Sequence, residues 1–112
     1  MHRLDPDTER AARQFLDRIR GRYDLAGAIV YGSRARGNPR PDSDVDLAVI
    51  LRGERRRTLP IKLDMADAAF DVLLATNVLI SPLPVWLDEW EHPDTFSNPA
   101  LLRNIEREGV PL

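Results

Sequence analysis

The segment from Tyr31 to Leu51 constrains the fold of this chain most strongly, because it joins two aspartates to an apolar run. Asp44 and Asp46 are two residues apart, so an extended backbone points both carboxylates to the same face. Val45 and residues 47–51 are all apolar, which is typical of a strand covered on both faces of a sheet. The segment therefore predicts a buried strand that carries a pair of carboxylates at its beginning.

A glycine-serine turn precedes this pair. Gly32 and Ser33 follow the apolar stretch "LAGAIVY", which predicts a short strand over residues 25–32 that ends at the glycine. Backbone N–H groups at such a turn can hold a phosphate, and the Ser33 hydroxyl can add a contact or cap the turn. Arg34 and Arg36 add positive charge, either as surface residues or as phosphate ligands, and Arg36 is the candidate for phosphate.

The carboxylate pair suits a metal ion. Two carboxylates side by side repel each other unless a cation lies between them. Magnesium is a hard ion that takes oxygen ligands and leaves positions for phosphate oxygens and water. Asp44 and Asp46 are therefore the candidate metal ligands, and Gly32, Ser33 and Arg36 are the candidate phosphate-binding residues. Each short motif is common in ordinary turns and loops, so this interpretation depends on their combination at this spacing.

Periodicity and punctuation predict the remaining elements. Asp5 and Pro6 are typical of a helix start, and an apolar stripe with helical spacing follows from Ala12 to Tyr23. Pro82 and Pro84 remove ladder donors from a third strand, which should lie at a sheet edge or end early. A helix is expected over residues 59–77, with an apolar stripe formed by Ile61, Met65, Ala68, Ala69, Val72 and Leu73. A strand over residues 78–86 and a loop or short turn over "LDEWEHPDTFSNP" should follow. The last element expected is a helix over residues 100–110, with Asn98 as its cap, Pro99 at its first position and Gly109 as its stop.

This order of elements predicts an α/β (α+β) fold, with a small mixed sheet of about three to four strands and helices packed against it. The 112 residues are the size of one domain, so a single domain over residues 1–112 is expected. The sequence contains no cysteine, which excludes disulfides, cysteine-ligated zinc and thiol catalysis. No run is long enough to span a bilayer, and a cytoplasmic location is the default expectation.

The charge balance does not favour nucleic acid or an anionic membrane as the partner. The net charge is -2, from 16 basic and 18 acidic residues. The basic stretch "RGERRR" over residues 52–57 lacks interleaved aromatic residues, which favours a solvated loop over a nucleic-acid site.

The stretch "GSRARG" followed by "SDVDLAV" resembles the signature of the DNA polymerase beta-type nucleotidyltransferase superfamily, and in pattern it is closest to minimal nucleotidyltransferase domains. The resemblance is specific over Tyr31 to Leu51 and extends loosely, by element order, to about Trp86. It implies the polymerase-beta-type fold, a Gly-Ser turn that binds a nucleoside triphosphate, and an Asp-x-Asp pair that binds magnesium. The matching residues are Gly32 and Ser33 for the turn, Asp44 and Asp46 for the pair, Arg36 and Gly37 after the turn, and Asp42 and Ser43 in the loop before the pair. The resemblance thus implies that Asp44 and Asp46 are catalytic residues and that Gly32, Ser33 and Arg36 bind the nucleotide.

The chain departs from this pattern at the third carboxylate. The resemblance implies a third aspartate on the strand after the second helix, which completes the metal site and activates the acceptor hydroxyl. Ser81 stands near the expected place, and that strand contains no acid. Asp71, Asp88, Glu89 or a group from a partner chain are the alternatives, and a true absence is favoured over a displaced substitute. Loss of a general base costs roughly 10²–10⁴-fold in rate. We therefore expect an enzyme whose transfer reaction is impaired.

Three functional hypotheses follow from the residues and the resemblance. The first is magnesium-dependent transfer of a nucleoside monophosphate, with ATP as the expected donor, to a hydroxyl of a protein or other acceptor, helped by a partner chain or a self-dimer. The second is a catalytically weak or inactive nucleotide-binding antitoxin module that acts by binding a HEPN-type protein. Trp86 and Trp90 are interpreted as exposed, which favours a surface that binds such a partner. The third is a degenerate fold that binds neither metal nor nucleotide.

Overall fold

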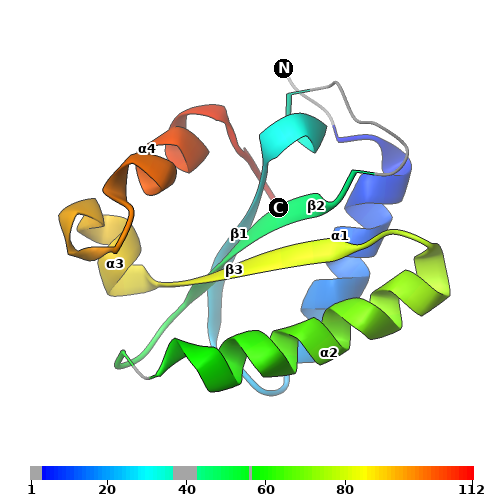
Figure 1. Cartoon of the computed structure of the whole chain (residues 1–112), viewed down its shortest axis with the longest axis horizontal. Coiled ribbons are helices and arrows are strands. Elements are labelled where there is room, and N and C mark those ends of the chain that lie inside the picture. Colours follow the sequence, from blue (N-terminus) through cyan, green and yellow to red (C-terminus); the bar gives the residue numbers. More distant parts are fainter. Residues whose placement is uncertain (1–3, 37–42, 56) are drawn as a thin grey trace.

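The central sheet has four strands in the order β3-β2-β1-β4. The computed structural model describes residues 4–36, 43–55 and 57–112. β1 pairs antiparallel with β2 and β4, and β2 pairs parallel with β3, so the sheet is mixed as predicted. Figure 1 shows the elements in chain order: α1 (Pro6–Ile19), β1 (Leu25–Tyr31), β2 (Val45–Leu51), α2 (Thr58–Thr76), β3 (Ile80–Trp86), α3 (Leu87–Glu91), α4 (Pro99–Glu108) and β4 (Val110–Pro111).

Helices cover both faces of the sheet (Figure 1). On one face, alternate residues of β2 pack with α1 and α2 in the larger core cluster, and Val45, Leu47 and Val49 are fully buried there. On the other face, Ala48 of β2 packs with Leu102 of α4. The apolar run of β2 is therefore covered on both sides, as its sequence predicts.

The predicted helix starts are confirmed. The Asp5 carboxylate accepts a hydrogen bond of 3.0 Å from the backbone N–H of Thr8, and Pro6 opens α1. The Asn98 side chain accepts one of 3.3 Å from the backbone N–H of Leu101 in the first turn of α4. Local side chains therefore fix where both helices begin.

The edge position of β3 is also confirmed. β3 pairs with β2 alone in the described sheet, and Pro82 and Pro84 lie inside it. Its seven residues pair in unbroken register with the seven of β2, from Val45 opposite Ile80 to Leu51 opposite Trp86. Parallel pairing places the beginnings of the two strands side by side.

The C-terminal part differs from the expectation in three places. The segment expected as a loop forms the short helix α3 and a 3-10 turn over Pro93–Thr95, and Val110 and Pro111 add the fourth strand beside β1. Trp86 is only 3% exposed and belongs to the core, so its interpretation as an exposed partner-binding residue is wrong. Trp90 packs partly buried against the α4 side of the sheet. Among the described helices, none has the length and apolar character needed to cross a membrane.

Candidate nucleotide and metal site

Gly32 follows β1 and lies against the beginning of β2. Tyr31 is the pairing partner of Asp46, so the next residue of the chain passes beside that carboxylate. Gly32 has a φ of +76°, which L side chains rarely adopt, and a Cβ at this position would clash with Oδ2 of Asp46. Glycine is therefore required at this position for two reasons: its backbone conformation and the close approach of the aspartate.

The predicted turn after β1 is present as a 3-10 turn over Gly32–Arg34. The backbone N–H groups of Ala35 and Arg36 both donate to the Gly32 carbonyl, at 3.1 and 3.2 Å. The first N–H groups of such a turn have no acceptor within it, which leaves them available to an anion. Ser33 is half-buried in this turn. The phosphate contacts assigned to Gly32 and Ser33 stay predictions.

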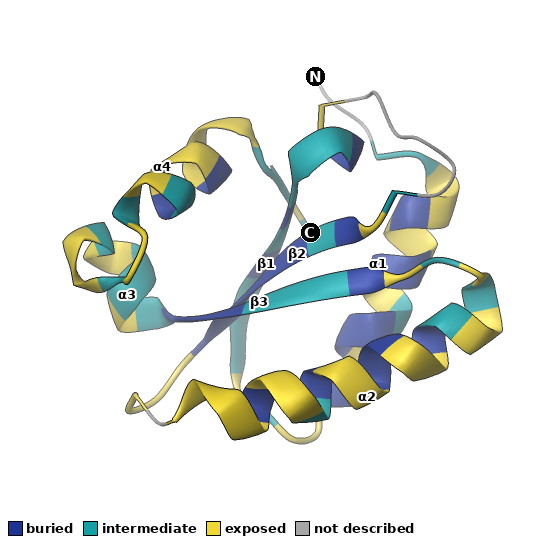
Figure 2. Cartoon of the chain, in the orientation of Figure 1, coloured by how far each residue is buried: buried dark blue, intermediate teal, exposed yellow. Residues whose placement is uncertain are grey.

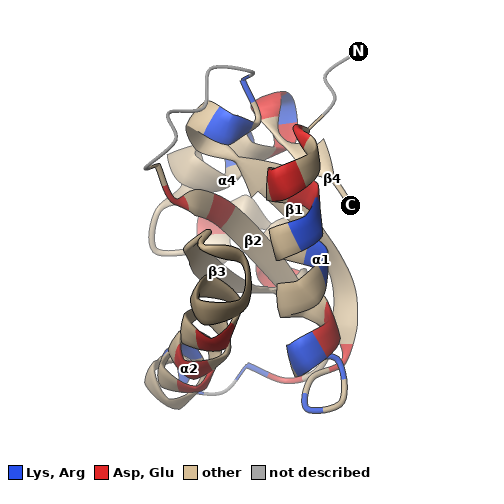
Figure 3. Cartoon of the chain, turned by 90° about the vertical axis from the view of Figure 1, so that its right-hand side faces the viewer, with Lys and Arg blue, Asp and Glu red and all other residues tan. Residues whose placement is uncertain are grey.

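Asp44 and Asp46 lie at the beginning of β2, where Figure 3 shows the acidic positions. Asp44 is exposed and Asp46 is half-buried. Burial raises the pKa of Asp46 above its usual value, the negative charge of Asp44 raises it further, and the positive charge of Arg36 opposes both. Burial and the charge of Asp46 also raise the pKa of Tyr31. A partly desolvated carboxylate beside a second one is a donor set that fits a hard cation.

The two arginines of the turn have different roles. The sequence predicts Arg34 to be a surface or phosphate-binding residue, but the structure shows that it is buried. Its guanidinium donates to the Ser43 carbonyl, at 2.6 Å from one terminal nitrogen, and to the Thr8 hydroxyl at 2.9 Å. Arg34 therefore ties the residues before β2 to the beginning of α1. No local sequence pattern reveals this role, because both partners are distant along the chain.

Arg36, the second arginine of this segment, lies on the surface. It is exposed, and its guanidinium lies 3.9 Å from a carboxylate oxygen of Glu108 at the end of α4. Its charge acts on Asp46, which places it within electrostatic reach of the carboxylate pair. Gly37 and Asp42, the other residues matched to the superfamily pattern, lie outside the described residues.

The sheet register places Ser81 where the third carboxylate is expected. Ser81 of β3 is the pairing partner of Asp46, and in parallel strands paired residues share a face. Asp71, proposed as an alternative, lies on α2 and faces Arg18 of α1 at 3.9 Å. α2 packs on the face of β2 opposite to Asp46, so Asp71 does not supply the missing group.

Asp88 and Glu89 are also engaged elsewhere. Both follow the far end of β3, whereas Ser81 lies near its beginning. The Asp88 carboxylate accepts from Arg55 at 2.8 Å, and Glu89 accepts from the backbone N–H of Trp86 at 3.0 Å. Within residues 4–36, 43–55 and 57–112, no group of three or more metal-ligating acids or histidines is found. Among the described residues, the candidate site therefore contains two carboxylates, those of Asp44 and Asp46.

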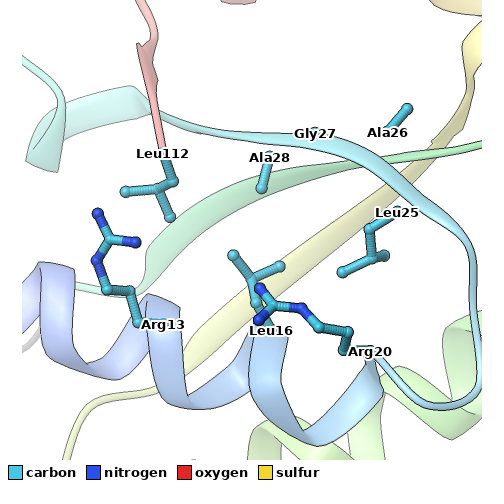
Figure 4. A pocket seen from close by; sticks show the side chains of 8 residues that line it. All are labelled: Arg13, Leu16, Arg20, Leu25, Ala26, Gly27, Ala28 and Leu112. Carbon is cyan, nitrogen blue, oxygen red and sulfur yellow. The ribbon is translucent and has the colours of Figure 1, made fainter.

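Two hollows lie outside the carboxylate pair. Figure 4 shows one of about 200 Å³ between α1 and β1, lined by Arg13 and Arg20 among others, but these arginines already face Glu9 and Asp17 at 3.7 and 3.2 Å. The other, of about 380 Å³, is lined by Thr58, Lys62, Leu83, Pro84, Glu89, Thr95, Phe96 and Ser97. Its lining combines α2 residues with Leu83 and Pro84 of β3, so the second hollow lies along the β3 edge of the sheet.

A model of the family described as "Nucleotidyltransferase domain" matches residues 12–105, which contain the turn, the aspartate pair and Ser81. The chain belongs to the nucleotidyltransferase domain family. Nucleotidyl transfer is therefore the reaction class to which its fold and motif correspond, and nucleotidyltransferase domains generally use a divalent metal. No curated protein matches the chain.

The fold is also that of a solved nucleotidyltransferase-like structure. The crystal structure of a presumed nucleotidyltransferase from Sulfolobus solfataricus superposes with a TM-score of 0.57. The match covers 94% of this chain and 81% of the other, at 16% sequence identity. This likeness supports the architecture of the sheet and its helices.

Proposed function

We propose that this nucleotidyltransferase domain binds a magnesium-nucleoside triphosphate, with ATP as the donor, and transfers the nucleoside monophosphate to a hydroxyl group. The observation that carries the proposal is the approach of the Gly32 turn to Asp46, which juxtaposes an anion-binding backbone and a carboxylate pair. Neither element alone distinguishes a nucleotide site from an ordinary turn. Together they offer complementary positions for a triphosphate and its cation.

Each residue has a defined task in this proposal. The turn amides and the Ser33 hydroxyl hold the phosphates, and Arg36 adds charge from the exposed side. Asp44 and Asp46 would hold magnesium, which when bound neutralises charge on the phosphates. The acceptor oxygen attacks the α-phosphorus, the bond to the β-phosphate breaks, pyrophosphate leaves, and the hydroxyl proton passes to solvent.

Ser81 makes slow transfer the expected behaviour. A serine hydroxyl beside Asp46 is a poor base at neutral pH, so proton removal from the acceptor is not assisted by a carboxylate there. The acceptor, whether a protein hydroxyl or a smaller molecule, must therefore react without a general base from the described residues. Binding of the nucleotide does not need that group.

The same observation supports a second candidate. A domain that binds nucleotide and transfers slowly fits an antitoxin-like module whose main role is to bind a HEPN-type protein. Co-purification with such a partner, when one is encoded beside this chain, would support this role. A chain that stays separate from that protein would contradict it.

The experiment that tests the main proposal measures binding and transfer separately. Calorimetry with magnesium-ATP should give a binding isotherm with the wild-type chain and none with the Asp44→Asn, Asp46→Asn double variant. With ATP labelled at the α-phosphate, candidate acceptors should then become labelled only in the presence of the wild-type chain. Equal binding and equal labelling by the double variant would contradict the proposal.

A further inference from the structure

α2 is apolar on two opposite sides. Its inner side, which includes Met65 and Val72, packs in the core as the sequence predicts. Its outer side is exposed along its whole length, as Figure 2 shows. Four large apolar residues lie there with 55–71% of their surface in water, and we call them the outer stripe: Leu59, Leu63, Phe70 and Leu74.

The outer stripe has the spacing of a helix-packing seam. With Ala66 its members recur at intervals of four, three, four and four residues, which keeps them on one line of an α-helix. A surface helix of a monomer normally has one apolar face and one polar face. Soluble monomers rarely expose a contiguous apolar patch larger than a few hundred Å², and four largely exposed residues of this size reach that range. α2 is therefore composed like a helix that is covered on both sides.

The spacing is also symmetric, which indicates the occupant. Leu63 and Phe70 are equally far from the midpoint between Ala66 and Asp67, and so are Leu59 and Leu74. A two-fold axis through this midpoint would place Leu63 of one chain on Phe70 of the other, and Leu59 on Leu74. The small Ala66 at the centre allows the two helices to approach closely. Such a self-complementary patch is what a two-fold dimer requires.

The charges beside the outer stripe are compatible with this pairing. Asp64 is bound by Arg22 and Asp71 faces Arg18, so these two acids are compensated within the chain. Asp67 is exposed and has no ion-pair partner among the described residues, and the axis would bring it near its own copy. This single repulsion weakens the pair without preventing it, because the groups lie at the solvated rim.

We propose that the chain forms a two-fold symmetric dimer through the outer stripe of α2, with the two helices antiparallel and Ala66 at the axis. α2 covers the sheet face opposite to Asp46, so both candidate sites stay open in this dimer. The proposal is independent of nucleotidyl transfer, since it uses no residue of the site. It rests on the exposure, the seam spacing and the symmetry of one helix.

Sedimentation velocity tests the assembly. The wild-type chain should sediment at twice its 12.7 kDa mass, and Leu63→Glu should return it to the monomer. Leu63 is 61% exposed, so this change leaves the core intact, which circular dichroism and the thermal midpoint check. Ala75→Glu, at an exposed position of α2 outside the stripe, is the matched control and should stay dimeric. Asp67→Asn should tighten the dimer several-fold.

Cysteine cross-linking tests the axis, because the chain has no cysteine of its own. Ala66→Cys should form a disulfide with its own copy under mild oxidation. Leu59→Cys should not link to itself, because antiparallel helices centred at Ala66 separate the two copies of residue 59 by about 22 Å at 1.5 Å per residue. A mixture of Leu59→Cys and Leu74→Cys chains should link. A wild-type monomer would overturn the proposal and leave the stripe to a different protein, and self-linking of Leu59→Cys would overturn the antiparallel arrangement.

Discussion

Asp46 of β2 lies opposite Ser81 of β3, so the sheet offers a hydroxyl at the position where the resemblance to the superfamily predicts a carboxylate. If this exchange limits transfer, Ser81→Asp should raise the transfer rate. A carboxylate that removes a proton contributes about 10²-fold or more. The measurement is the initial rate of label transfer from α-labelled ATP, with nucleotide affinity followed in parallel.

Ser81→Asn is the matched control for this prediction, because it has nearly the same shape as the aspartate and no charge. It should transfer at the wild-type rate. A gain in both variants would mean that the side-chain volume, and not the base, had changed the rate. Adding Asp46→Asn to Ser81→Asp should remove the gain if the two carboxylates act on the same cation.

Gly32→Ala should destabilise the fold. The backbone at Gly32 has a φ of +76°, and the added Cβ meets the Asp46 carboxylate. A non-glycine residue held in a left-handed conformation costs about 1–3 kcal/mol. Urea denaturation measures the loss of unfolding free energy. Gly21→Ala is the control, because a Cβ there meets no atom within 4 Å, and an unchanged or slightly raised stability is expected.

Asp46→Asn should stabilise the chain at neutral pH when divalent metals are chelated. Burial raises the folded-state pKa of Asp46, as does Asp44, so the folded protein holds this proton more tightly than the unfolded chain does. Wild-type stability should therefore fall as the pH rises from the ordinary value of 3.8 through the raised pKa. The two proteins should differ least below pH 3.8 and most above that window. Unfolding free energies across this pH series that run parallel would contradict the raised pKa.

Arg34→Ala and Arg36→Ala should separate stability from binding. Arg34 is buried, and its loss leaves the Ser43 carbonyl and the Thr8 hydroxyl without their charged donor, at a cost of about 3 kcal/mol. Arg36 is exposed, so its loss should leave the unfolding free energy nearly unchanged while weakening magnesium-ATP binding about tenfold. Denaturation and calorimetry on both variants check the pair. Equal stability losses would contradict the assignment.

The local elements of this fold follow from local residues, which is why the sequence predicts them well. Asp5 and Asn98 cap their helices through contacts three residues away, and Gly109 ends α4 where predicted. The apolar runs also predict strands β1 and β2, and the structure shows that these strands pair and bring Gly32 beside the carboxylate pair. Caps and turns of this kind depend on neighbours in sequence, so local sequence patterns predict them.

The features that the sequence did not predict depend on distant partners. Arg34 is buried because Thr8 and Ser43 meet around it, and no spacing rule connects these residues. β4 consists of two residues whose pairing with β1 is set by where α4 ends. The outer stripe of α2 has helical spacing like the inner one, and the predicted stripe included only the side that meets the core.

The two prolines of β3 also protect the folded chain against edge-to-edge aggregation at high concentration. Backbone N–H groups of a strand alternate between its two edges, and the pairing with β2 is unbroken, so Pro82 and Pro84 both remove donors from the outer edge. An added strand would find carbonyls there but would lack two of the N–H groups that a continuous ladder needs. Sheet-to-sheet polymerisation through β3 is thereby blocked, and association of folded chains is left to surfaces made of side chains.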